Sequence, residues 1–473
     1  MMLKRIAPSL TLPSKAAQGV ASVRPQAARL CIEHFVPCMT EQVGGDAVLR
    51  VFAAAVVVFV LASCSSIDAP RDSQPTGTGA AAPVTLLAFG DSGYHYDYLE
   101  REDYETVVTR EQFIEKERLD WIEDKRPIEE LAFPPMHRLA RNGSMVSASG
   151  LAPVSKAMHA YCSQEAGCDL AVMLGDNIYP DGATANADGR DAERFRDLFT
   201  TPFAGLAQGR EDFRIYAVLG NHDWRTSRAG ALAQVRFLER TPPFYMDGLI
   251  YRVRPPAGRG QLEIFAIDTE VLLSSTVVYK AKLADDASEI RHEAVEKPHD
   301  WAKPQTDLER NMARWLDEAL RSSTARWKVV IGHHPLWSTS GSKFEQAHVL
   351  RRLILPTLCR YADVYLAGHE HTLEVHTDSC AAANVGVAVD PLPQVVSGSA
   401  SKMRPTNSAF IQRQLSSHPE LRTLYAKGLT WGFAHLTFER EKMSVRIVET
   451  SADAATQVVY DRTFTRRTHR GAD

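Results

Sequence analysis

The sequence lacks the features that mark several large classes of protein. A membrane-spanning helix needs about 20 apolar residues, and the longest apolar run here, Val51–Ser63, is shorter. There is no excess of positive charge, because the chain has 54 Lys and Arg residues and 58 Asp and Glu residues. No surface for nucleic acid is therefore evident. None of the four cysteines beyond Cys64 has a CxxC or a Cys/His zinc spacing. What remains is a globular protein whose 44% apolar residues can form a substantial core.

The apolar run Val51–Ser63 has the length of the apolar region of a signal peptide. It follows Arg50 and ends in Leu-Ala-Ser-Cys, which resembles a bacterial lipobox, where the cysteine, here Cys64, is lipidated and becomes the mature N-terminus. We therefore expect an exported protein, a periplasmic or outer-membrane-anchored lipoprotein that contacts the membrane through its lipid only. An ordinary secretory signal is the alternative. Because Met1–Arg50 is long for the charged part of a signal, a translation start at Met39 or later fits better.

The remaining chain divides by composition. Residues 1–64 are the signal region, and residues 65–83, rich in Ser, Gly, Pro and Ala, are typical of a flexible tether. We expect residues 84–465 to form one large domain with insertions at about 94–149 and 274–304, which we expect to be helices or loops over the ends of its sheet. The charged run in the first insertion indicates a solvated face more than a substrate role. Four cysteines follow Cys64, and in an exported protein an even number favours two disulfides, Cys162–Cys168 and Cys359–Cys380. Four free thiols are the alternative.

A repeated pattern starts at Val84, in which a short apolar run ends at Gly and a polar residue follows. The runs VTLLAF, DLAVML, RIYAVL, WKVVI and ADVYLA have strand length and no alternation, which is typical of strands buried on both faces. Helical patterns lie between them, and Leu308–Leu320 is the clearest. This alternation predicts an α/β layered sheet. The glycines permit positive φ and close backbone approach, which would turn the next side chain into a shared cavity.

Ligands in open α/β sheets collect beyond the carboxyl ends of the strands, and a potential metal ligand follows each strand here. The motifs are GDSG, GDNIY, GNHD, GHHP and GHEH. They supply two carboxylates, one phenol, one amide and three imidazoles, a mixed set that is too large for one ion and suits a pair sharing one carboxylate. The predicted ligands are Asp91, Asp176, Tyr179, Asn221, His333, His369 and His371.

This succession of motifs resembles the calcineurin-like metallophosphoesterase superfamily, and Tyr179 in GDNIY resembles its purple acid phosphatase branch. The segments FAIDTE and GLTWGFAHLTF are further matches, and the resemblance covers residue 84 to the end apart from the insertions. It implies a four-layer α/β/β/α sandwich. It also implies two metal ions, Fe(III) in the first site and Zn, Fe or Mn(II) in the second, with attack on phosphorus by a metal-bound hydroxide.

Motif position also assigns the ligands. The resemblance implies that Asp91, Tyr179 and His371 bind the first metal, that Asn221, His333 and His369 bind the second, and that Asp176 bridges the two. A phenolate is a hard anionic donor and suits a trivalent ion.

The resemblance leaves the acid and base less defined. His222, next to Asn221, is the candidate that contacts phosphate and protonates the leaving oxygen, and a second-shell hydrogen bond is the alternative. We expect Asp223 to orient a neighbour. Relatives often carry a histidine shortly after the GHxP motif, but residues 336–346 contain none. His334 either takes the place of that missing histidine or only packs against its neighbours.

These observations favour a phosphomonoesterase that acts on a small phosphorylated substrate. A phosphodiesterase or nucleotide pyrophosphatase with the same centre is the first alternative, and a protein that binds phosphate compounds without turnover is the second. The sequence leaves the physiological substrate and the oligomeric state open.

Overall fold

The computed structural model describes residues 82–99, 106–164, 167–186, 190–276, 278–283, 289–296, 299–341 and 344–468. By its internal contacts the chain divides into two units, residues 1–76 and 77–473, and all described residues lie in the second. The apolar run Val51–Ser63, Cys64 and most of the predicted tether lie outside the described residues.

The first sheet has seven strands in the order β18-β17-β16-β1-β4-β5-β6. Strands β1, β4, β5 and β6, from the centre of the sheet to one edge, run parallel to one another. On the other side of β1, strands β16, β17 and β18 each pair antiparallel with their neighbour. The bounds are β1 Val84–Phe89, β4 Leu170–Leu174, β5 Ile215–Val218, β6 Phe244–Tyr245, β16 Trp431–Phe438, β17 Lys442–Thr450 and β18 Thr456–Thr465.

The second sheet also has seven strands, in the order β15-β13-β14-β12-β11-β8-β7. Its centre, β8, β11, β12 and β14, is parallel, and β7, β13 and β15 pair antiparallel at the sides. The bounds are β7 Ile250–Val253, β8 Leu262–Ile267, β11 Trp327–Ile331, β12 Val364–Ala367, β13 Leu373–Asp378, β14 Leu392–Ser397 and β15 Leu421–Lys427.

The two sheets pack face to face at their centres. The Ser397 hydroxyl at the end of β14 donates to the carbonyl oxygen of Ala88 in β1 over 2.8 Å and accepts from the N–H of Ala434 in β16 over 3.1 Å. Every residue of β4, β5, β8, β11 and β12 is buried. Burial on both faces explains why the strands lack alternation, as the sequence predicted.

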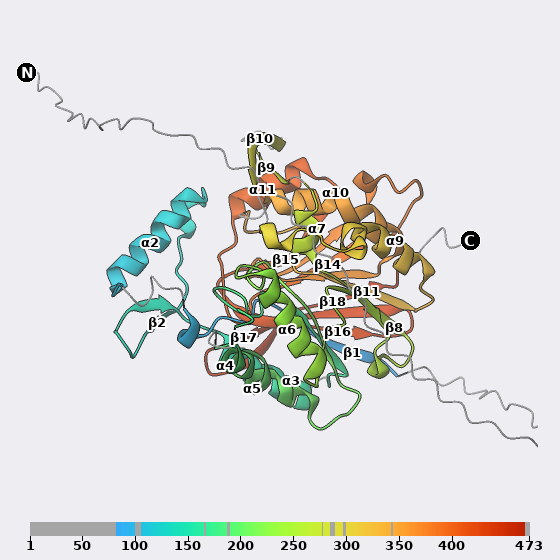
Figure 1. The fold of residues 1–473 in the computed structure, drawn as a ribbon. Helices are drawn as coiled ribbons and strands as arrows, with labels where there is room; N and C mark the ends of the chain where they lie inside the picture. The colour runs from blue at the N-terminus through green and yellow to red at the C-terminus, as the bar shows by residue number, and fades with distance from the viewer. Residues whose placement is uncertain are drawn as a thin grey trace, which may run out of the picture. The chain divides into compact units, whose positions relative to one another are not determined.

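Helices cover the outer faces, with α3, α4, α5 and α6 on the side of the first sheet and α7, α9 and α10 on the side of the second (Figure 1). The layers are therefore helix, sheet, sheet and helix, which confirms the predicted four-layer α/β/β/α sandwich. The helices are α2 Arg110–Glu123, α3 Leu151–Gln164, α4 Asp191–Phe195, α5 Thr201–Phe203, α6 Arg228–Arg240, α7 Thr269–Ser274, α8 Asp307–Arg310, α9 Met312–Ser322, α10 Phe344–Tyr361 and α11 Ser408–Ser417.

The predicted helix Leu308–Leu320 is divided in two. Asn311, with φ −108° and ψ 19°, separates α8 from α9. Met312, Leu316 and Leu320 are buried as the helical stripe requires, but Leu308 is 45% exposed. The predicted helix was therefore wrong at its first residue, because Asn311 interrupts the helix and Leu308 no longer shares one continuous face with Met312.

The two insertions contain more strand than expected. The first holds α2 and a short pair, β2 Met136–Arg138 and β3 Met145–Ser147. The second forms a hairpin of β9 Val278–Leu283 and β10 Glu289–Glu296, so the expectation of helix or loop was wrong there. From Tyr279 to Leu283 the sequence YKAKL has a lysine at every second position, which is the period of a strand.

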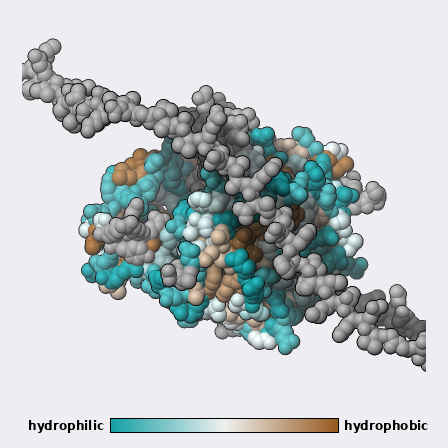
Figure 2. Space-filling model, viewed as in Figure 1, coloured by the Kyte–Doolittle hydropathy of each residue, from teal (hydrophilic) through white to brown (hydrophobic). Residues whose placement is uncertain are grey.

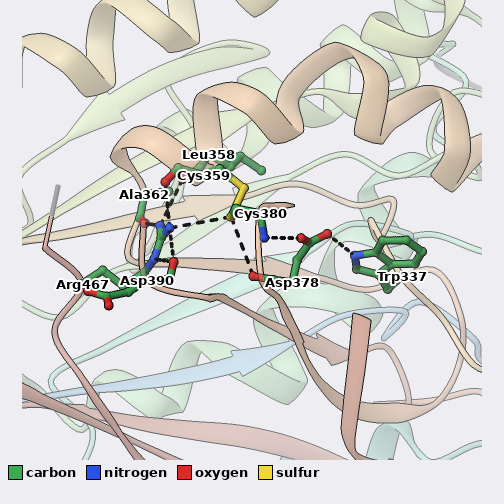
Figure 3. Close-up of a disulfide and its surroundings, with 8 residues drawn as sticks. All are labelled: Trp337, Leu358, Cys359, Ala362, Asp378, Cys380, Asp390 and Arg467. Carbon is green, nitrogen blue, oxygen red and sulfur yellow. Dashed lines mark hydrogen bonds between the residues drawn. A yellow bond between two sulfur atoms is a disulfide. The ribbon is translucent and has the colours of Figure 1, made fainter. Parts of the chain in front are cut away.

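Both expected disulfides are present, Cys162–Cys168 and Cys359–Cys380. The second joins Cys359, near the end of α10, to Cys380, two residues beyond the end of β13 at Asp378 (Figure 3). Arg467 fastens the C-terminal strand to the same place, because its guanidinium donates to the carbonyl oxygens of Cys359 and Asp390, each over 2.7 Å. This closure ties three segments that are distant in sequence.

The face in Figure 2 is mostly hydrophilic in its described part. Among the described residues no helix combines the length and the apolar character needed to cross a membrane.

Candidate metal centre

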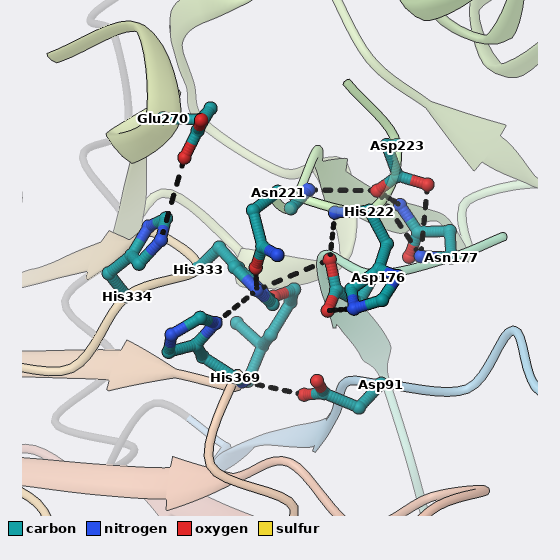
Figure 4. A network of polar contacts seen from close by, with 12 residues as sticks. Asp91, Asp176, Asn177, Asn221, His222, Asp223, Glu270, His333, His334 and His369 are labelled. Atoms are coloured by element: carbon teal, nitrogen blue, oxygen red, sulfur yellow. Dashed lines mark hydrogen bonds and ion pairs between the residues drawn. The ribbon is translucent and has the colours of Figure 1, made fainter. Parts of the chain in front are cut away.

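The seven predicted ligands come from two different sheets. Asp91, Asp176 and Asn221 lie just beyond the carboxyl ends of β1, β4 and β5 in the first sheet, and Tyr179 lies in the loop after Asp176. The three histidines follow β11 and β12 in the second sheet. Since parallel strands end at one edge of a sheet, stacking the two sheets places both sets around one point (Figure 4).

The backbone at these turns meets the expectation in part, because among the strand-ending glycines only Gly175 has a positive φ, of 87°. Positive φ falls on the ligands themselves, Asp91, Asp176, His369 and His371, with values of 50° to 74°. The preceding glycines mainly provide space: a Cβ on Gly368 would lie 2.5 Å from Asp91 Oδ2, and one on Gly220 would lie 2.3 Å from Asp176 Oδ1. Close approach of backbone to carboxylate, and the strained ligands themselves, are typical of a functional site.

The first group of donors surrounds the phenol oxygen of Tyr179. This oxygen lies 2.9 Å from Asp91 Oδ1, 2.8 Å from Asp176 Oδ2 and 3.0 Å from His371 Nε2. The ligand atoms of Asp91, Asp176 and His371 all lie within 4.8 Å of one another. Three oxygens and one imidazole nitrogen therefore face one small volume.

The second group surrounds His333 Nε2. Asp176 Oδ1 lies 3.3 Å from this atom, Asn221 Oδ1 lies 3.2 Å from it and His369 Nδ1 lies 3.0 Å from it. Asp176, His333 and His369 also form a set whose ligand atoms lie within 4.8 Å. Asp176 belongs to both groups, which is the position required of a bridging carboxylate.

His333 and His369 each make a hydrogen bond on the outer side of the ring, so the other ring nitrogen is an acceptor that points into the cluster. His333 Nδ1 donates to the carbonyl oxygen of Leu174 over 2.8 Å, and His369 Nε2 donates to Gln346 Oε1 over 3.0 Å. The acceptor nitrogens His333 Nε2 and His369 Nδ1 then face each other and the Asp176 carboxylate. A cation satisfies such converging acceptors, so the donor set fits metal ions.

The electrostatics of the buried acids agree with this fit. Burial raises the pKa of the Asp91 carboxyl well above its usual value, and Asp176 adds to the effect. Burial acts on Asp176 in the same direction, but His333 and His222 outweigh it and hold the Asp176 pKa well below the usual range. Burial and the two carboxylates raise the pKa of the Tyr179 phenol. Adjacent cations favour the ionised form of all three groups.

His222 lies at the rim of this cluster. Its backbone N–H donates to Asp176 Oδ1 over 2.8 Å, its Nδ1 bonds the carbonyl oxygen of Pro180 over 2.6 Å, and its Nε2 lies 4.0 Å from Asp176 Oδ2. The ring is half-buried, and burial lowers the pKa of His222 to about 3. The Nδ1 contact directs Nε2 toward the cluster.

Asp223 points away from the ligands. It accepts N–H groups from Gly220 over 2.8 Å and from Asn177 and Ile178 over 3.1 Å each, so it joins the loops that carry Asn221 and Asp176. Burial raises the Asp223 pKa to about 7, and Asp176 adds to the rise. Such contacts suit the orienting role that we expect for Asp223.

His334 lies behind the second group. Its Nδ1 is 2.7 Å from the Thr269 hydroxyl, its Nε2 is 3.7 Å from Glu270 Oε2, and its ring centroid is 4.3 Å from that of His369. His334 therefore packs against a ligand and bonds α7 rather than facing the cluster.

Two site residues went unnoticed in the sequence. Gln346 holds the ring of His369, and it comes from the same segment that lacks the histidine common in relatives. Lys402 lies beyond β14 with its ammonium 4.8 Å from the ring centroid of Tyr179. No strand-end motif marks either residue, so no local signal pointed to them.

Comparison with known proteins agrees with the motifs. The family model described as Calcineurin-like phosphoesterase matches residues 136–373, about half of the chain. Tartrate-resistant acid phosphatase type 5 of Oryctolagus cuniculus is 26% identical over 294 residues, which is 61% of this chain and 78% of that protein. Purple acid phosphatase 3 of Arabidopsis thaliana is 28% identical over 214 residues, 44% of this chain and 49% of that protein. The chain belongs to the calcineurin-like phosphoesterase family.

Proposed function

We propose that this chain is an exported phosphomonoesterase that works at a dinuclear metal centre. Its family and its similarity to acid phosphatases make it a metal-dependent phosphoric ester hydrolase. In detail, we propose that Fe(III) is held by Asp91, Tyr179 and His371. The second ion, Zn, Fe or Mn(II), is held by Asn221, His333 and His369, and Asp176 bridges the two ions. The observation that carries it is the pair of donor groups that share Asp176.

The reaction transfers a phosphoryl group to water. Two bound cations would supply Lewis acidity and an activated water. The oxygen of water bonds to phosphorus, the bond from phosphorus to the ester oxygen breaks, and that oxygen leaves with the electron pair and takes up a proton.

In this proposal His222 protonates the leaving oxygen. Its Nδ1 is held by the Pro180 carbonyl, so Nε2 is the atom that can meet a substrate. An anionic phosphate near Nε2 favours the protonated imidazole, which can then donate its proton.

One experiment separates a phosphomonoesterase from a phosphodiesterase and from a protein that binds phosphate compounds without turnover. The metal-loaded protein is assayed with an aryl phosphate monoester and with the matching diester. Faster turnover of the monoester supports the proposal, and faster turnover of the diester supports the phosphodiesterase alternative. If neither ester is hydrolysed while both metals are bound, only the binding role remains.

His222→Ala should lower kcat for a monoester about 100-fold or more, the effect of losing a general acid. Both metals should stay bound, because the backbone N–H of residue 222, not the ring, contacts Asp176. His159→Ala is a matched control, since the His159 ring also bonds a proline carbonyl, that of Pro202. A kcat equal to that of the unchanged protein would assign His222 a purely structural role.

Export is supported by the two disulfides, which persist in oxidising compartments. We expect protein from a bacterial membrane fraction to begin at a lipidated Cys64, which mass spectrometry of the N-terminal peptide detects. Cys64→Ala should release the protein from that fraction. Recovery of unprocessed, reduced protein from the cytoplasm would contradict export.

A further inference from the structure

A fully buried carboxylate, that of Glu370, lies between two of the metal ligands in the sequence. Glu370 separates His369 from His371 in the turn after β12, and it is 0% exposed. The two histidines have positive φ, 74° and 50°. Such a backbone is strained and persists only where the surrounding contacts hold it. We therefore expect the contacts of Glu370 to help hold this turn.

The Glu370 carboxylate joins the ends of three neighbouring strands. β14, β12 and β11 lie side by side and parallel in the second sheet. Glu370 Oε2 accepts the hydroxyl of Ser340, in the loop after β11, and Arg404 Nη1, in the loop after β14, the latter over 3.1 Å. A buried carboxylate needs such partners, because removing its charge from water is costly. Glu370 therefore ties the central turn to the loops on both sides.

Arg404 reaches the same turn through its backbone. Its N–H donates to the carbonyl oxygen of His371 over 3.0 Å. Its own carbonyl oxygen accepts the N–H of Leu429 over 2.9 Å, two residues before β16 of the first sheet. Arg404 is thus fixed to the first sheet on one side and holds residues 370 and 371 on the other.

The ring of His371 lacks a support that the other two histidine ligands have. Each of those rings is fixed by an outer hydrogen bond. Within the part of the chain that the structure describes, His371 Nδ1 has no hydrogen-bond partner, and Nε2 lies 3.0 Å from the Tyr179 phenol oxygen and 3.3 Å from Asp91 Oδ1. An outer contact normally sets the orientation of a metal-binding imidazole. The orientation of His371 therefore depends on how its backbone is held.

We propose that Arg404 is a positioning residue for the first metal site. Its ion pair with Glu370 and its bond to the His371 backbone hold the turn so that His371 Nε2 faces the phenol oxygen of Tyr179. The inference rests on the metal centre of the proposed function and adds a residue that acts through Glu370 and His371.

The second metal site depends less on this pair. The backbone N–H of His369 donates to Asp91 Oδ2 over 2.7 Å, and its ring is held by Gln346. These two contacts fix His369 without Arg404. Loss of the ion pair should therefore weaken the first site more than the second.

The test is the rate at which a chelator removes each metal from protein loaded with iron and zinc, followed by metal analysis and by the visible band. Arg404→Met removes the positive charge at similar length, and Glu370→Gln removes the negative one. Each should release iron about 10-fold faster or more, with a smaller change for zinc. Arg404→Lys should restore most of the retention, because an ammonium can replace the contact that one guanidinium nitrogen makes.

A double variant and a matched control sharpen the test. If the two residues act as one pair, Arg404→Met with Glu370→Gln should release iron no faster than the faster single variant. Glu263→Gln is the control, since this buried carboxylate also accepts a serine hydroxyl, that of Ser323, and an arginine, Arg254. Glu263 lies near the start of β8, away from the strand ends that carry the ligands. The control should lower the melting temperature and leave iron release unchanged.

The outcomes separate positioning from other roles. Unchanged iron release in both single variants overturns the inference, and so does equally fast release from Glu263→Gln, which would make the pair a general stabiliser. A raised KM with unchanged iron release would make Arg404 a substrate contact instead. Because release is measured without substrate, protein that binds iron but hydrolyses no ester refutes the proposed function and still decides the role of Arg404. Unchanged protein that binds no iron overturns both.

Discussion

Asp176→Asn should reduce kcat by roughly three orders of magnitude or more, because the residue shared by both donor groups loses its charge. The substitution keeps the size of the side chain, so the backbone contacts of the loop can persist. Asn is a poor bridge between two cations, and we expect at least one metal to be lost. Steady-state hydrolysis of an aryl phosphate with metal analysis of the same sample measures both effects.

A matched control lies at the other end of the same strand. Asp169 precedes β4 and pairs with Arg259 over 2.8 Å, far from the ligands in the strand direction. Asp169→Asn should retain activity and metal content. Unchanged rates in Asp176→Asn with both metals bound would refute the bridging assignment.

Tyr179→Phe should abolish the visible absorption of the metal-loaded protein. A phenolate bound to Fe(III) produces a charge-transfer band, and phenylalanine has no oxygen to bind the ion. Removal of the phenol takes away the atom around which Asp91, Asp176 and His371 converge. The measurement is an absorption spectrum of protein purified without chelator, with iron content determined in parallel.

Tyr216→Phe is the control for this spectrum, since Tyr216 is also buried but lies within β5. Its spectrum should match that of the unchanged protein. Iron that stays bound in Tyr179→Phe with an unaltered band would show that the phenol is not a ligand.

The charged insertion shows where sequence patterns fail. Phe113 and Trp121 are buried, 6% and 5% exposed, within a run that is rich in charged residues. Apolar residues scattered among so many charges do not predict which side of α2 packs against the rest of the domain, because that packing depends on the contact of Arg126 with the loop after β14. The contact joins residues more than 270 positions apart.

The sequence by itself determined the five strands β1, β4, β5, β11 and β12, the turn after each one and the chemical identity of the predicted ligands, because a buried strand and its following turn are local patterns. Only the tertiary structure decided that Asp176 from one sheet meets His333 and His369 from the other, that Asp223 and His334 face away, and that Gln346 and Lys402 join the site. The physical reason is that these distances depend on how two sheets stack and how distant loops are tied together, which no short segment encodes.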